Sequence, residues 1–321
     1  MDNILTLEQK STLLLKLEKW ECPVKYSYIF DEWALLWDKI ERKRIKKSWE
    51  YSESELLEKN IEIYLNELWN PSKLCIFDFW CWTWNTIKWM LDILIKKWIY
   101  IYYHWFDISN EILKIAELNF SKYKWKINFN SSILDFETDN LITKINEVRK
   151  DYHKIPVLGM LLWNTVWNFD STERVISNIM DSLRLEDRFI IWIEQSNINN
   201  EDKIEKMILW YKSKLVYDLS FTTLKYLWFK ENDWKYFVKF NKNNNTIEWF
   251  IKLNINKKIK ILDNEIFFNK SEKIKIFHSK KLNSQELSKL IVSDLWYRIW
   301  NLSTNLEDTY CQVLIQTKKY Y

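Results

Sequence analysis

The sequence predicts an α/β fold: a doubly wound parallel sheet with an inserted α+β subdomain. Short apolar runs alternate with helical patterns between residues 74 and 194, which is typical of parallel strands joined by helices. Acidic residues stand at the ends of the first three predicted strands, the edge where open sheets of this class bind ligands. The alternation breaks at residue 196 and resumes near residue 281, which indicates an insertion.

The chain is expected to begin with a helical region over residues 1–70. Leu13, Leu17, Leu57 and Leu65 fall on helical spacings, and Pro71 ends the segment because proline does not continue a helix. We expect the sheet domain to comprise residues 71–195 and 281–321, with the inserted subdomain at 196–280.

The sheet domain is read as five strands that alternate with helices. The expected strands are 74–79, 99–106, 127–134, 156–162 and 188–194, and the expected helices are 86–97, 110–120, 141–149 and one beginning near Asp170, with Glu173 three residues later as in a capping box. The insertion is expected to hold a helix at 202–212 and strands at 236–240, 247–253 and 274–278, before a helix at 284–295 and strands at 297–302 and 310–317 return to the sheet.

The loop after the first strand has Trp at every second position: Trp80, Trp82 and Trp84. With glycine at these positions it would read D-F-G-C-G-T-G-N, the strand–loop–helix turn of a nucleotide-binding α/β unit. Such a loop needs glycine because its backbone turns at positive φ and approaches the ligand closely.

The numbers of Trp and Gly are also abnormal. The chain has 21 Trp and 1 Gly, whereas a chain of this length ordinarily carries about 22 Gly, roughly 7%. Trp98, Trp228 and Trp296 follow predicted helices, the usual place of a helix-ending glycine. We infer that most or all Trp codons are read as glycine in the source organism, as when UGA encodes glycine. The alternative is a truly Trp-rich protein that binds sugars or single-stranded nucleic acid with exposed aromatic faces.

Charge and cysteine usage exclude several classes. The net charge of +4, from 48 basic and 44 acidic residues, is too balanced to demand nucleic acid. Cys22, Cys75, Cys81 and Cys311 show no metal-ligand spacing and suit a reducing compartment, so no metal is expected. There is no signal-peptide pattern and no run of 18 apolar residues. We therefore expect a cytoplasmic protein, a monomer without a membrane partner.

The acidic residues at the strand ends are candidate ligand contacts. Asp78 ends the first strand, and Asp107 ends the second, 23 residues after Trp84, a spacing that suits a carboxylate bonded to ribose hydroxyls. Asp135 ends the third strand and could accept from an adenine amino group, with Phe136 against the ring. The alternative for Asp107 and Asp135 is simple capping of the helices that follow.

The loop pattern separates the possible cofactors. G-K-[ST] with P-loop spacing is missing, so NTP hydrolysis is unsupported. An NAD enzyme is an alternative because its fingerprint overlaps, but it needs G-x-G-x-x-G, whereas this loop with glycine gives G-x-G-x-G. That pattern, with Asp107 and Asp135, resembles class I S-adenosylmethionine-dependent methyltransferases, whose fold is Rossmann-like. S-adenosyl-L-methionine is therefore the expected cofactor.

A narrower resemblance lies at residues 162–169. With glycine for Trp163 and Trp167 they read L-G-N-T-V-G-N-F, which is similar to the L-G-S-T-I-G-N-[FL] signature of the histidine-specific (ergothioneine-pathway) N-methyltransferase family. The segment 30–33 resembles the family's Y-D-E-x-G entry, and 50–52 resembles its E-Y-P-T-R segment.

The resemblance implies roles for particular residues. The methyl donor would be held by Asp78, Trp80, Trp82, Trp84, Asp107, Asp135 and Phe136. Asn168 would bind the α-amino or carboxylate group of the amino-acid substrate, with Tyr51 and Tyr211 contacting the same molecule. Ser279 falls at the family's serine near the imidazole, which makes 196–280 the substrate-binding subdomain.

Three positions depart from the family. Its imidazole-binding glutamate aligns with Phe277, the lysine after its glycine loop aligns with Thr86, although Lys88 is near, and the arginine after the tyrosine segment is missing. The sequence thus predicts an S-adenosylmethionine-dependent N-methyltransferase that acts on the amino group of a histidine-like or other small amino-acid substrate. The alternative is a catalytically inactive protein of the same fold that serves as a binding module.

Overall fold

The computed structural model describes residues 4–45, 51–80, 85–123, 125–162, 165–195, 201–306 and 308–316. The chain divides into two compact units. The first comprises Met1–Ile40 and Asn197–Lys281, and the second comprises Glu41–Ser196 and Leu282–Tyr321. The helical region expected at 1–70 is therefore shared between the two units, and residues 1–40 belong with the inserted subdomain.

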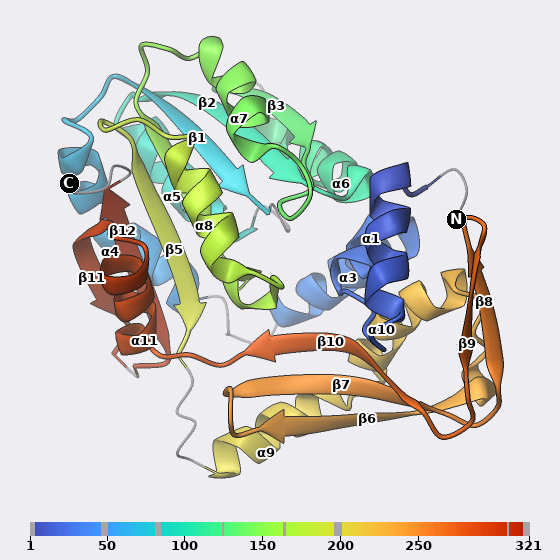
Figure 1. The fold of residues 1–321 in the computed structure, drawn as a ribbon. Helices are drawn as coiled ribbons and strands as arrows, with labels where there is room; N and C mark the ends of the chain where they lie inside the picture. The colour runs from blue at the N-terminus through green and yellow to red at the C-terminus, as the bar shows by residue number, and fades with distance from the viewer. Residues whose placement is uncertain are drawn as a thin grey trace. The chain divides into compact units, whose positions relative to one another are not determined.

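The second unit is built on a seven-stranded sheet, which confirms the predicted α/β class. The strand order is β11-β12-β5-β4-β1-β2-β3 (Figure 1). Strands β1 to β5 run parallel, β12 is antiparallel to β5, and β11 is antiparallel to β12. Their bounds are Lys73–Phe79 (β1), Tyr100–Asp107 (β2), Ile127–Ile133 (β3), Val157–Leu161 (β4), Arg188–Glu194 (β5), Arg298–Thr304 (β11) and Tyr310–Gln316 (β12).

Helices connect these strands and cover the sheet. They are α4 (Tyr51–Glu67), α5 (Asn85–Lys96), α6 (Asn110–Phe120), η1 (Ser121–Tyr123), α7 (Leu141–Lys150), η2 (Thr165–Asn168), α8 (Thr172–Asp181) and α11 (Ser284–Lys289), which continues as a π-helical turn, η4 (Leu290–Asp294). In Figure 1, α7 and α8 lie on the face of the sheet toward the viewer. No helix within the described ranges is both long and apolar enough to cross a membrane.

Helix α8 begins at Thr172, close to the start expected near Asp170, but its N-cap is Ser171, which makes no side-chain capping bond. The Asp170 amide donates to the Glu137 carboxylate at 2.8 Å, in the loop after β3. The capping box expected from Asp170 and Glu173 is therefore not the N-terminus of this helix.

The first unit holds helices around a small antiparallel sheet. The sheet order is β10-β7-β6, with β6 at Trp234–Asn241, β7 at Thr246–Leu253 and β10 at Lys273–Lys280. A separate hairpin pairs β8 (Lys257–Ile261) with β9 (Asn264–Phe268). The helices are α1 (Leu7–Leu17), α2 (Lys25–Ile29), α3 (Asp31–Ile45, of which the residues to Ile40 belong to this unit), α9 (Glu201–Tyr211), α10 (Lys214–Tyr226) and the short η3 (Glu231–Asp233). Leu13 and Leu17 of α1 share one buried core with Ile247 and Ile251 of β7.

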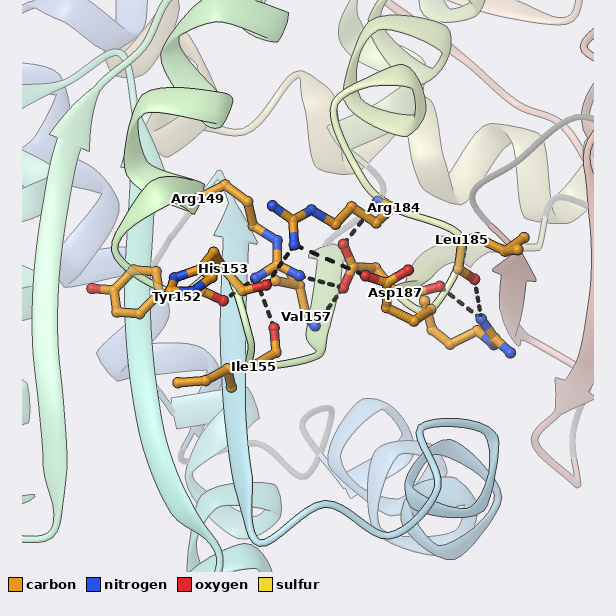
Figure 2. Close-up of polar contacts among 10 residues, drawn as sticks. Arg149, Tyr152, His153, Ile155, Val157, Arg184, Leu185 and Asp187 are labelled. Carbon is orange, nitrogen blue, oxygen red and sulfur yellow. Dashed lines mark hydrogen bonds and ion pairs between the residues drawn. The ribbon is translucent and has the colours of Figure 1, made fainter.

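A buried ion pair closes the edge of the main sheet at which β4 and β5 begin (Figure 2). The Arg149 guanidinium, at the end of α7, donates to the Asp187 carboxylate at 3.0 Å and to the Ile155 carbonyl at 2.7 Å. The same carboxylate accepts from the amides of Val157 at 2.7 Å and Arg184 at 2.8 Å. Arg149 thus fastens the loops before β4 and β5 at the edge opposite the strand ends considered next.

Candidate functional site

Parallel register brings the carboxyl ends of β1, β2 and β3 to one edge of the sheet. Phe79 pairs with Phe106, and Asp107 pairs with Ile133. Two backbone bonds continue this edge beyond the strands: the Trp80 amide donates to the Phe106 carbonyl at 2.8 Å, and the Leu134 amide to the Asp107 carbonyl at 2.9 Å. The predicted donor residues at 80, 107, 135 and 136 therefore lie along one rim.

Asp107 is a buried carboxylate at the end of β2, only 3% exposed. Its Oδ1 accepts from the Ser109 amide at 2.8 Å. The N-cap of α6 is Ser109, whose Oγ accepts from the Ile112 amide at 3.3 Å, so Asp107 is not the cap of this helix. Burial raises the pKa of Asp107 to about 8, which the Ser109 hydrogen bond opposes and the nearby Asp78 charge reinforces.

Asp135 is hydrogen-bonded mainly to residues that follow it closely in the chain. Its Oδ1 accepts from the amides of Glu137 at 3.0 Å and Thr138 at 3.3 Å, which closes the turn after β3. The cap of α7 is Asn140, whose side chain accepts from the Thr143 amide at 3.1 Å. Asp135 therefore shapes the loop that presents Phe136 and does not cap the helix.

Trp80 fills the space beside Phe136. Its indole is buried and lies 5.7 Å from the Phe136 ring and 5.6 Å from the Phe169 ring, measured between centroids. Its φ is +82°, in the left-handed region that favours glycine. The sequence places a ligand ring against Phe136, and in this chain the indole of Trp80 packs there instead. Trp82 and Trp84 lie outside the described residues.

Asp78 is held by β2. Its Oδ2 accepts from the Tyr103 hydroxyl at 2.7 Å and from the Trp105 indole N–H at 3.2 Å. Burial raises the pKa of Asp78 to about 7, although both hydrogen bonds lower it. The Asp78 carboxylate is thus bonded to side chains of the neighbouring strand, β2.

The residues predicted to contact substrate divide between the units. In the second unit, Asn168 is half-buried at the end of η2, and Tyr51 is the first residue of α4, its side chain outside the described part. In the first unit, Tyr211 ends α9 and Ser279 is buried on β10, where it pairs with Ile247. Within this unit, Phe277 stacks on Trp249 with a centroid separation of 3.7 Å.

Sequence reasoning missed Lys281, a buried lysine just after β10. Its ammonium donates to the Tyr211 hydroxyl at 3.0 Å, which joins two parts of the first unit that are 70 residues apart. A register shift between Lys275 and Phe277 moves the inward positions of β10 from even to odd residues, so Ser279 and Lys281 both become buried. No local pattern in the sequence reports such a shift.

The family described as histidine-specific methyltransferase, SAM-dependent, matches residues 49–316. No curated protein matches the chain. Among solved structures, the chain is similar to an S-adenosylmethionine-dependent methyltransferase from Clostridium acetobutylicum, at 11% identity over 87% of this chain and 96% of that one, with a TM-score of 0.47. It is also similar to a sugar N-methyltransferase from a Streptoalloteichus species, at 10% identity over 86% and 91% of the two chains, with a TM-score of 0.41.

Proposed function

Because the chain belongs to the histidine-specific, S-adenosylmethionine-dependent methyltransferase family, we propose that it methylates the amino group of a small amino-acid substrate. S-adenosylmethionine is the cofactor of this family. The observation that carries the proposal is the family match over residues 49–316, which spans the loop, the acidic strand ends and β10.

Two groups at the strand ends suit the methyl donor. The Asp107 carboxylate is buried, does not cap α6, and stands at the ribose position that the loop spacing predicts. Phe136 offers an aromatic face for the adenine, and the turn that presents it is closed by Asp135. The indole of Trp80 does not suit the donor, because it packs against the same ring.

The substrate residues are assigned from the family. Asn168 and Tyr51 would recognise the amino-acid end, since an amide and a phenol can hydrogen-bond to an α-amino or carboxylate group. In the first unit, the family assigns Tyr211 and Ser279 to substrate contact. A reactive amine must be neutral with its lone pair directed at the methyl group, so positioning supplies most of the rate and no acid or base need be assigned.

Phe277 restricts which amino acid suits the site as methyl acceptor. A glutamate at this position would accept the ring N–H of a bound imidazole, whereas phenylalanine offers no acceptor. Burying that donor without a partner costs about 1–3 kcal/mol. An apolar or aromatic amino acid therefore suits the site better than histidine.

The test is a methyl-transfer assay over the standard amino acids, with the glycine form of the protein, in which every Trp is replaced by glycine. Methylation of one or a few amino acids, with an aromatic or apolar one preferred, is the expected result. Saturable binding of S-adenosylmethionine without transfer to any amine would instead support the binding module.

A further inference from the structure

Left-handed backbone is concentrated at Trp. Among the described residues, eleven have positive φ and none of them is glycine. Six of the eleven are Trp: Trp20 (55°), Trp69 (61°), Trp80 (82°), Trp98 (61°), Trp228 (60°) and Trp296 (64°). A bulky L-residue is strained in this region because its Cβ meets the backbone, whereas glycine is not.

Four of these Trp end helices in the same way. At Trp98, its own amide donates to Ile95 at 3.1 Å and the next amide, Ile99, donates to Leu94 at 3.1 Å. This pair of bonds is the Schellman motif, whose left-handed position is normally glycine. The amides at 20–21, 69–70 and 228–229 make the corresponding pairs at 2.8–3.0 Å, as shown by Trp20 to Leu17, Trp69 to Asn66 and Trp228 to Lys225. Trp98 is 92% exposed, so side-chain packing does not compensate for the strain there.

A second, independent observation concerns buried indoles. The indole N–H groups of Trp167, Trp192, Trp234 and Trp249 are buried without a hydrogen-bond acceptor in the part of the chain that the structure describes. Buried polar groups in folded proteins are nearly always hydrogen-bonded, so four such indoles in one chain are anomalous. Glycine has no such group, and the anomaly disappears if these positions are glycine.

We propose that the Trp positions of this sequence, including all three in the cofactor loop, are glycine in the protein made by its own organism. The Trp80 indole also occupies the place expected for a ligand ring against Phe136, and glycine at this position explains that conflict as well. Glycine at position 80 removes the indole from the face of Phe136 and relieves the strain at φ +82°. The inference stands on backbone geometry and hydrogen bonding, and does not depend on the proposed reaction.

Peptide mass spectrometry of the protein purified from its source organism tests the inference directly. Trypsin cleavage after Lys73 and Lys88 releases one peptide that spans residues 74–88 and contains all three loop positions. The expected mass is that of three glycines, with UGA at the corresponding codons. A peptide with the mass of three Trp would overturn the proposal, whatever the enzyme assay shows.

Recombinant variants test the structural premise. Trp98→Gly is expected to raise the melting temperature by about 1–4 °C, and Trp98→Ala is expected to raise it less, because alanine also has a Cβ. Equal effects of the two substitutions would show that left-handed strain is not the cause. S-adenosylmethionine is expected to bind the glycine form and not the Trp form in calorimetry, and equal affinity for the two forms would refute the explanation of the site.

Discussion

Replacing Asp107 with asparagine removes the charge from the end of β2 but keeps an oxygen for the Ser109 amide, which now donates to Asp107 at 2.8 Å. Asp107 is at the predicted ribose position, so at pH 9, above its pKa of about 8, the substitution exchanges a charge-assisted acceptor for a neutral one. Such a loss costs about 1.5–3 kcal/mol, which is roughly a 10- to 150-fold weaker affinity for S-adenosylmethionine. At this pH we expect Asp107→Asn to weaken donor binding without lowering stability, because asparagine also removes a buried charge.

Two further variants separate binding from folding. Asp107→Ala also leaves the Ser109 amide, which is fully buried, without this acceptor, so we expect an additional loss of about 1–3 kcal/mol in the free energy of unfolding. Ser109→Ala removes the cap of α6 and should cost about 1 kcal/mol of stability, with donor affinity retained. Calorimetry with S-adenosylmethionine and urea unfolding, both on the glycine form, measure the two effects. If Asp107→Asn bound the donor as tightly as its parent, the carboxylate would serve only to shape the turn.

Three other predictions concern the buried Arg149–Asp187 pair, Asp78 and Phe277. Asp187→Ala should lower the free energy of unfolding by about 3–5 kcal/mol, because it leaves the buried Arg149 without its carboxylate; Lys114→Ala, which breaks an exposed pair, should leave urea unfolding unchanged. Folding raises the pKa of Asp78 from 3.8 to about 7, so the folded state favours its protonated form. The stability that this contributes is fully present below about pH 4 and is lost as pH rises through 7. Asp78→Asn should therefore gain in stability over its parent as pH rises from 4 to 8, and a constant difference in urea unfolding would contradict this assignment. Phe277→Glu should increase methyl transfer to histidine in the glycine form; an unchanged rate would show that this position does not face the imidazole.

Elements with strong local signals were predictable from the sequence. The helix expected at 110–120 is α6, because Ser109 caps it and Ile112, Ala116 and Phe120 form its buried face. The strand expected at 99–106 is β2 with a shift of one residue. The acidic residues were placed at the correct edge of the sheet because their positions follow from the strand ends alone.

Features that depend on distant residues were not predictable. The sequence did not predict the β8–β9 hairpin, which forms a separate two-stranded sheet within the inserted region. The burial of Lys281 depends on the register shift in β10, and its partner Tyr211 is 70 residues away. The capping alternative for Asp107 could be settled only by the hydrogen bonds that identify Ser109 as the cap of α6.

Trp249 packs against two aromatic residues that the family alignment assigns to the substrate site. The indole of Trp249 lies 3.7 Å from the Phe277 ring and 4.8 Å from the Tyr211 ring, so it has an aromatic neighbour on two sides. If residue 249 is glycine, both rings lose this neighbour, and one aromatic group is missing between residues predicted to contact the substrate. Aromatic rings pair favourably in stacked and edge-on geometries, and the Phe277 ring offers no acceptor to an imidazole N–H. An aromatic amino-acid side chain is therefore the group whose chemistry replaces the indole best, which agrees with the preference over histidine expected from Phe277.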